Sequence, residues 1–205
     1  MIIPALPPEP ARLIAGWAVR WHSPAEITCP TRGKFIETIE PQCFSAAVAS
    51  GVVDLIFSHD RRRGVIATQR NGSLKLSQDS AGLWFEAEVG DSAIGDEALE
   101  VVRGAGYRAA SVGMTEALSR WSYDRDGRHH RAIMSAGLRE ISICSRGAHP
   151  SARIAAGRLP IERLKAEGRL DRLARAEAEV ASQRAWGSAD IRGLPDPYRC
   201  ERPAL

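Results

Sequence analysis

Hydrophobic and polar residues alternate along much of the first 155 residues, at the period-two spacing that is typical of β-strands. Residues 82–89 show it most clearly, because Leu83, Phe85, Ala87 and Val89 fall on one face and a tryptophan and two glutamates on the other. This pattern predicts a half-buried antiparallel strand. Similar patterns predict further strands at residues 12–21, 33–39, 52–60, 64–70, 72–78, 107–118 and 138–145.

Two segments carry helical signals instead. Residues 40–51 place a proline where the first turn of a helix tolerates one, and they end at Gly51. Residues 91–106 begin with Asp91 or Ser92 as a cap, repeat apolar residues at helical spacing and close with glycines. Many short strands with two helices predict an α+β fold, built around a β-barrel or a strongly bent, mostly antiparallel sheet that a few helices wrap.

The character of the sequence changes after about residue 155. The following stretch is rich in Arg, Glu and Ala, and its apolar stripe, which includes Leu164, is too thin to predict deep burial. The last residues resemble a disordered tail. We therefore expect three parts: a flexible N-terminus at 1–11, a folded domain at 12–155, and a polar helical and disordered C-terminal tail at 156–205.

Composition and charge narrow the classes of function. The chain has 205 residues and a formal net charge of +3, which is small for this length and gives no reason to expect nucleic-acid binding. No apolar run approaches the ~20 residues that cross a bilayer, and the first residues lack the features of a signal peptide. The cysteines form no C-x-x-C pair, and His129 and His130 are adjacent and so point in different directions. We expect no metal, cofactor, nucleic acid or membrane.

Two of the predicted strands carry small polar residues on one face. In LREISICS, Glu140, Ser142 and Cys144 lie opposite the face of two isoleucines. In YRAASVGMTEAL, Ser111 lies on the face opposite Val112. If these strands are neighbours in a sheet, Ser111 and Glu140 can lie on the same side of it.

His59 ends the predicted strand at residues 52–60, where an imidazole can reach over a sheet surface. A neutral imidazole can accept the proton of a serine hydroxyl, and a carboxylate can orient the imidazole. Ser111, His59 and Glu140 are therefore the right chemical types for nucleophile, base and orienting group. Each also has an ordinary structural interpretation. Ser111 could be a small residue in a crowded strand, His59 part of a surface turn, and Glu140 a solvated strand residue. Composition and periodicity do not choose between these interpretations.

Six stretches occur in an order and spacing that resemble a known family. They are IAGWAV, IEPQCF, FSHD, GSLKLSQDSAGLWFEAEV, VVRGAGYRAASVGM and LREISICSRGAHPSARI. Together they resemble the prohead (capsid maturation) serine proteases of tailed bacteriophages, of the HK97 family, from about Leu13 to Ile154. The combination carries the resemblance, since short pieces such as SVG occur in many proteins. Departures from the family pattern at Gln42, Cys43, Met114 and Gly147 leave the three candidate residues unchanged.

The resemblance implies a serine endopeptidase that works through an acyl-enzyme, with a fold related to that of the herpesvirus assembly proteases. It would act in the host cytoplasm, in the interior of the assembling prohead. There it would cleave the scaffold segment of the major capsid protein and then itself. The herpesvirus analogy also implies self-association as a dimer. The alternative is an inactive capsid assembly or scaffolding factor that keeps the protease fold.

The resemblance also implies roles for single residues. Ser111 would be the nucleophile, His59 the base and Glu140 the orienting third member. His149 is the alternative third member, because the herpesvirus relatives use a second histidine.

Two further roles stay open. Arg146 and the backbone N–H of Gly147 are candidate donors to the oxyanion, where each good donor contributes roughly 3 kcal/mol. Cys144, on the predicted face of Glu140, is an alternative nucleophile.

Overall fold

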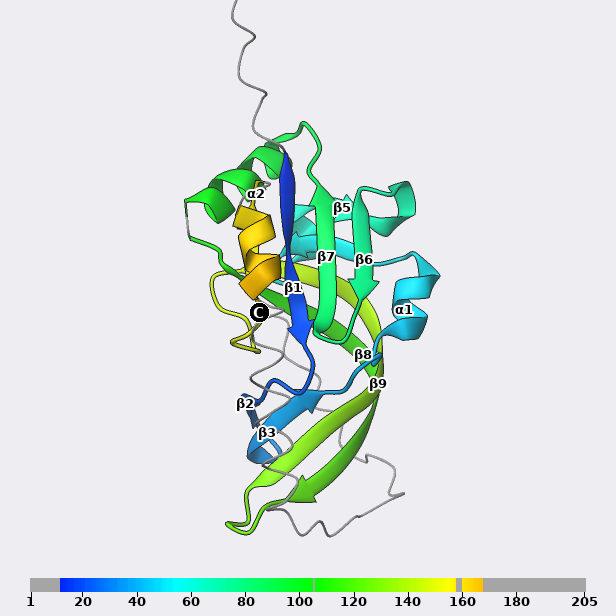
Figure 1. Ribbon diagram of the computed structural model, residues 1–205, viewed down its shortest axis with the longest axis vertical. Coiled ribbons are helices and arrows are strands. Elements are labelled where there is room, and N and C mark those ends of the chain that lie inside the picture. Colours follow the sequence, from blue (N-terminus) through cyan, green and yellow to red (C-terminus); the bar gives the residue numbers. More distant parts are fainter. Residues whose placement is uncertain (1–11, 105, 158–159, 168–205) are drawn as a thin grey trace, which may run out of the picture.

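The strands of this protein form two sheets in a computed structural model, which describes residues 12–104, 106–157 and 160–167 (Figure 1). The four-stranded sheet is antiparallel and has the order β10-β1-β7-β6. Its strands are β1 (Leu13–Arg20), β6 (Leu74–Gln78), β7 (Gly82–Glu88) and β10 (Ile154–Ala156). The six-stranded sheet has the order β2-β3-β9-β4-β5, and β8 pairs with β9. Its strands are β2 (Ala25–Cys29), β3 (Gly33–Ile39), β4 (Asp54–Phe57), β5 (Val65–Thr68), β8 (Ala109–Tyr123) and β9 (His129–Cys144).

Strand β9 organises the six-stranded sheet. It pairs antiparallel with β8 along its length. It also pairs in parallel with β3 near its start and with β4 near its end. The end of β9 therefore lies between β4 and β8. This arrangement brings three segments that are far apart in the sequence side by side, at residues 54–57, 109–113 and 140–144.

The alternating pattern of residues 82–89 is confirmed on its apolar face, since Leu83, Phe85 and Ala87 are fully buried. Trp84, on the opposite face of β7, is also buried, which the sequence pattern did not predict. The reason is a helix at residues 160–167, which packs on this outer face of the four-stranded sheet.

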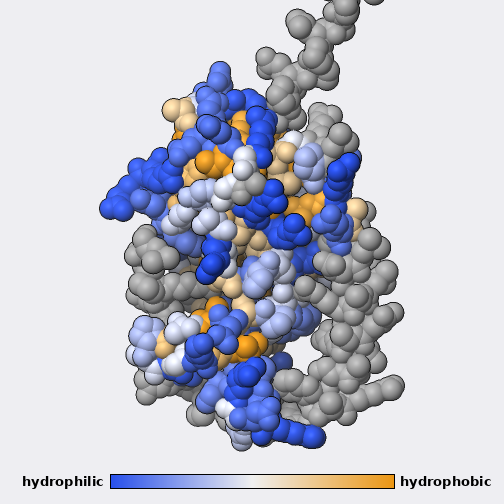
Figure 2. Space-filling view, turned by 90° about the vertical axis from the view of Figure 1, so that its left-hand side faces the viewer, coloured by the Kyte–Doolittle hydropathy of each residue, from blue (hydrophilic) through white to orange (hydrophobic). Residues whose placement is uncertain are grey.

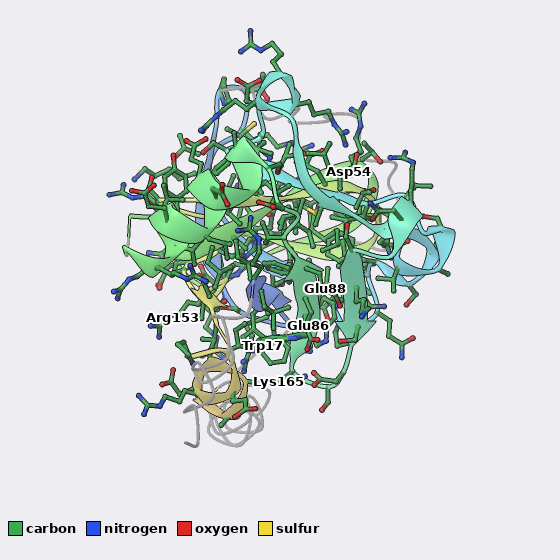
Figure 3. The ribbon with its side chains drawn as sticks, turned by 90° about the horizontal axis from the view of Figure 1, so that it is seen from above. Trp17, Asp54, Glu86, Glu88, Arg153 and Lys165 are labelled. Atoms are coloured by element: carbon green, nitrogen blue, oxygen red, sulfur yellow. The ribbon has the colours of Figure 1, made fainter. Side chains whose placement is uncertain are left out.

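Helix 160–167 contacts the sheet through apolar side chains. Its Ile161 and Leu164 cluster with Trp17 and Trp84. Lys165, labelled near Trp17 in Figure 3, places its Nζ 5.1 Å from the centre of the Trp84 ring. The prediction that this stretch is too thinly apolar to be buried is therefore wrong for Leu164. The two tryptophans supply apolar surface that the helix itself lacks.

Helix α2 (Ala93–Arg103) agrees with its predicted cap, because Ser92 Oγ accepts a hydrogen bond from the Gly95 N–H at 3.2 Å. Helix α1 (Ser45–Ser50) is shorter than predicted, and the proline and the residues after it form a turn instead. Its end is as predicted, at Gly51 with a φ of 69°. Two single turns of 3₁₀ helix follow β4 and β5, η1 (Arg61–Arg63) and η2 (Gln69–Asn71).

The α+β class is confirmed, but in the described part of the chain the strands do not close into a barrel. Strand β2 was not predicted. The stretch at 119–137, which separates the two strands predicted at 107–118 and 138–145, is itself mostly strand, because β8 and β9 continue into a long hairpin that curves away from the four-stranded sheet (Figure 1). The predictions for residues 1–11 and for 168–205 lie outside the described residues.

The surface in Figure 2 is mainly hydrophilic, with hydrophobic side chains in small separate areas. None of the helices that the structure describes has the length and hydrophobicity needed to cross a membrane.

Candidate active site

Ser111 and Glu140 lie on adjacent strands and on the same side of the sheet. The register of β8 and β9 pairs Ser111 with Ser142 and Gly113 with Glu140. Directly paired residues, and residues two apart on one strand, share a face. The two strands are thus neighbours, the condition under which the sequence predicted that Ser111 and Glu140 lie on one side of the sheet.

His59 comes to this face from the turn after β4. The Ser58 N–H donates to Ile143 O at 3.1 Å, and the His59 N–H donates to Ser142 Oγ at 2.9 Å. Both turn residues have positive φ, 42° for Ser58 and 62° for His59. This left-handed conformation is unfavourable for residues with side chains and persists only where the surroundings stabilise it. The two hydrogen bonds to β9 do so, and they direct the chain back over that strand.

The imidazole of His59 contacts the carboxylate of Glu140, with 3.1 Å between Nδ1 and Oε1. The carboxylate lies over Gly113, because a Cβ added at Gly113 would overlap it. Gly113 is two residues from Ser111 on the same face of β8. The contact is partly shielded from water, since the side chains of His59 and Glu140 are 25% and 12% exposed.

This arrangement favours one tautomer of a neutral histidine. A carboxylate at Nδ1 accepts the Nδ1–H, so the lone pair of a neutral imidazole is on Nε2. Within the described residues no hydrogen bond joins the Ser111 hydroxyl to His59, and Ser111 is 7% exposed. Such contacts are often long in free enzymes and shorten when substrate binds. The structure thus joins His59 to Glu140 directly and places Ser111 beside them on the same face.

Gly147 lies against the strand that carries Ser111. A Cβ added at Gly147 would overlap the carbonyl oxygen of Ala110, the residue before Ser111. The side chain of Arg146 is exposed. The two candidate oxyanion donors are therefore in the loop that approaches the start of β8.

His149 belongs to a different cluster. Its Nε2 lies 3.4 Å from Glu37 Oε1, and Glu37 also pairs with Arg131 at 3.4 Å. His149 and Glu37 are both buried. Among the described residues, the partner of the His59 ring is Glu140 and not His149.

Comparison with known proteins shows the family to which the chain belongs. The model of one family, described as caudovirus prohead serine protease, matches residues 7–167. The chain belongs to this family. It is thus a capsid maturation protease by family, with serine protease activity and with the phage prohead as its place of action. No curated protein and no solved structure matched the chain, so the implied relation to the herpesvirus proteases stays a prediction.

Cys144 of this prohead protease is poorly suited to be its nucleophile. Burial raises the pKa of the thiol to about 11, although the backbone N–H of Arg146 opposes the shift. The thiol of Cys144 donates a hydrogen bond to Ala109 O, with 3.6 Å between sulfur and oxygen. Since the thiolate is the reactive form, a raised pKa lowers the reactivity of Cys144 at neutral pH.

We expect iodoacetamide to leave the protease active at pH 8. With a pKa of about 11, the thiolate fraction of Cys144 at that pH is about 100-fold below that of an ordinary cysteine, and it should rise as the pH approaches 11. Mapping of alkylated peptides against time, in the folded and the unfolded protein, would measure this. Rapid inactivation that follows alkylation of Cys144 would support the thiol as nucleophile.

Sequence reasoning missed two residues that shape the candidate site. Ser142 holds the turn of His59, and Gly113 leaves room for the Glu140 carboxylate. Ser142 could have been found, since it shares its face with Glu140 and is a polar residue in a strand whose other face is apolar. Nothing in the sequence indicates that Gly113 lies under a side chain from another strand.

Proposed function

We propose that this prohead protease cleaves the scaffold segment of the major capsid protein inside the assembling prohead, and then cleaves itself. In this proposal Ser111 is the nucleophile, His59 the base and Glu140 the residue that orients His59. The contact of His59 Nδ1 with the Glu140 carboxylate, over the glycine two residues from Ser111, is the observation that carries the proposal.

The chemistry follows from these positions. Ser111 Oγ attacks the carbonyl carbon of the substrate's peptide bond while His59 Nε2 takes the hydroxyl proton. Glu140 stabilises the imidazolium that forms. When the tetrahedral intermediate collapses, the C–N bond breaks and the leaving amine takes the proton from His59. Water then attacks the acyl ester with His59 again as base, which releases the acid product and restores Ser111.

The negative oxygen of the tetrahedral intermediate needs hydrogen-bond donors. The position of Gly147 supports it as one of these donors. Gly147 lies against the carbonyl of Ala110, the residue that precedes Ser111. Glycine keeps its N–H, which a proline there would lack. Arg146 is the second proposed donor. Removal of one donor to an oxyanion typically lowers kcat by about 10²–10³-fold.

Co-expression of the protease with the phage's major capsid protein tests the proposed substrate. We expect the capsid protein to lose one terminal segment, and intact-mass measurement would identify the cleaved bond. The Ser111→Ala protease, co-expressed in the same way, should leave the capsid protein at full length.

A capsid protein that stays intact with both proteases would contradict the proposal. If capsids still assembled in that case, the result would support the alternative of an inactive assembly factor. We also propose that the protease self-associates as a dimer, as the herpesvirus analogy implies. Sedimentation of the purified protease would test this separately.

A further inference from the structure

A buried carboxylate lies near the candidate active site, on the strand next to Glu140. Asp54, labelled in Figure 3, starts β4. Its side chain is only 4% exposed. It accepts hydrogen bonds from Thr68 Oγ1 at 2.6 Å, from Arg61 Nη1 at 2.7 Å and from Arg70 Nη1 at 3.2 Å. Burial opposes its ionisation, but the hydrogen bonds from Thr68 and Arg61 and the two positive charges outweigh burial and lower the pKa of Asp54. Asp54 is therefore an anion that anchors arginine.

Arg61 extends from this anchor to the site. Its other terminal nitrogen, Nη2, donates to Arg139 O at 3.1 Å and lies 3.9 Å from Glu140 Oε2. The first oxygen of that carboxylate, Oε1, is the one that contacts His59. The parallel register pairs Asp54 directly with Glu140, so the guanidinium spans from one paired residue to the other.

The attraction between Arg61 and Glu140 contributes little energy by itself. The side chain of Arg61 is 48% exposed, so solvent screens most of the attraction between the two charges. Geometry is the more important effect. The planar guanidinium is held at two points, by Asp54 and by the carbonyl of Arg139, so it has a defined position beside Glu140 Oε2.

We infer that Arg61 is a positioning residue for the active site. Anchored by Asp54, it limits the rotation of the Glu140 carboxylate, so that Oε1 stays on Nδ1 of His59 and the imidazole keeps the orientation that Ser111 needs. Gly113 leaves space for the carboxylate on one side and Arg61 restrains it on another. This inference rests on the proposed roles of Ser111, His59 and Glu140.

A fluorophosphonate probe tests Arg61 without knowledge of the natural substrate. Ser111 Oγ attacks the phosphorus, fluoride leaves and His59 takes the hydroxyl proton, so the labelling rate reports how well His59 activates Ser111. We expect Arg61→Ala to lower this rate by about tenfold, because small displacements of catalytic groups have effects of this size or larger. The matched control is Arg62→Ala. Arg62 lies in the same turn and is 89% exposed, and its guanidinium binds Asp60 instead, so labelling should be unchanged.

The second measurement separates positioning from a purely structural role. In a Glu140→Gln background, Arg61→Ala should lower labelling little further, since the carboxylate that it restrains is already lost. A structural role would lower labelling by the same factor in both backgrounds. Arg61→Lys provides the comparison if Arg61→Ala unfolds. Lysine keeps the positive charge near Asp54 but lacks the second terminal nitrogen that lies beside Glu140. The Arg61→Lys protein should therefore also be labelled more slowly than the wild type. Thermal unfolding of each variant would confirm that it is folded.

Two results would overturn the inference. One is wild-type labelling in the folded Arg61→Ala and Arg61→Lys proteins, and the other is an equal loss with and without Glu140. In both cases the proposed function would stand, provided that the wild type is labelled at Ser111. A wild type that is not labelled there would contradict the proposed function, and the inference with it.

Discussion

Replacing Ser111 with alanine should reduce cleavage by about 10⁴-fold or more, and replacing His59 with alanine should have an effect of similar size. A serine hydroxyl is a weak nucleophile until a base accepts its proton, and the base has no function without the hydroxyl. The two residues therefore act as a unit. The double variant should be about as inactive as either single variant.

The measurement is the initial rate on a peptide that spans the bond mapped in the co-expression experiment. Ser122→Ala is a matched control, because Ser122 lies on the same strand as Ser111 but at its far end, paired with His130. It should cleave at the wild-type rate. A Ser111→Ala protein with wild-type activity would exclude Ser111 as the nucleophile.

Replacing Gly113 with alanine should lower cleavage by about 100-fold or more, although residue 113 takes no part in the chemistry. The added methyl group would occupy the position of the Glu140 carboxylate. Because that carboxylate is at the end of a flexible side chain, it can move aside, so the fold should survive while the contact with His59 is lost. An imidazole without its orienting carboxylate retains little of its catalytic power.

Two comparisons make the Gly113 prediction specific. Gly90→Ala should be harmless, because a Cβ at Gly90 has no atom within 4 Å and the residue lacks a positive φ. In a Glu140→Ala background the Gly113→Ala change should have little further effect, since the overlapping group is gone. Initial rates and thermal unfolding of all four proteins would decide. A folded Gly113→Ala protein with normal activity would show that the Glu140 contact is unimportant for cleavage.

The sequence alone determined the strand faces, because side chains alternate by local geometry in any extended chain. It separated Ser111 and Glu140 from the apolar residues beside them, and it located the ends of two helices through Ser92 and Gly51. It also identified the family through the order of six stretches. Each of these signals needs only residues that are close together in the chain, or a fixed order along it.

Local patterns were insufficient where one element covers another. Trp84 looked exposed on its strand, and the stretch with Leu164 looked too polar to be buried, until packing brought the two together. The lengths of β8 and β9 were underestimated. Polar residues in the outer half of their hairpin hide the alternation of apolar and polar residues on which the prediction depended.

Only the tertiary structure decided how the site is assembled. His59 contacts Glu140, and Ser111 lies on the same face, because β9 pairs in parallel with β4 and antiparallel with β8, and the register of these pairs is set by the packing of the whole sheet. The choice of Glu140 over His149 as the partner of His59, the space above Gly113 and the reach of Arg61 from Asp54 to Glu140 all follow from that register. Contacts between strands far apart in the chain leave no periodic signal in the sequence, so residue types alone could suggest the participants but not their arrangement.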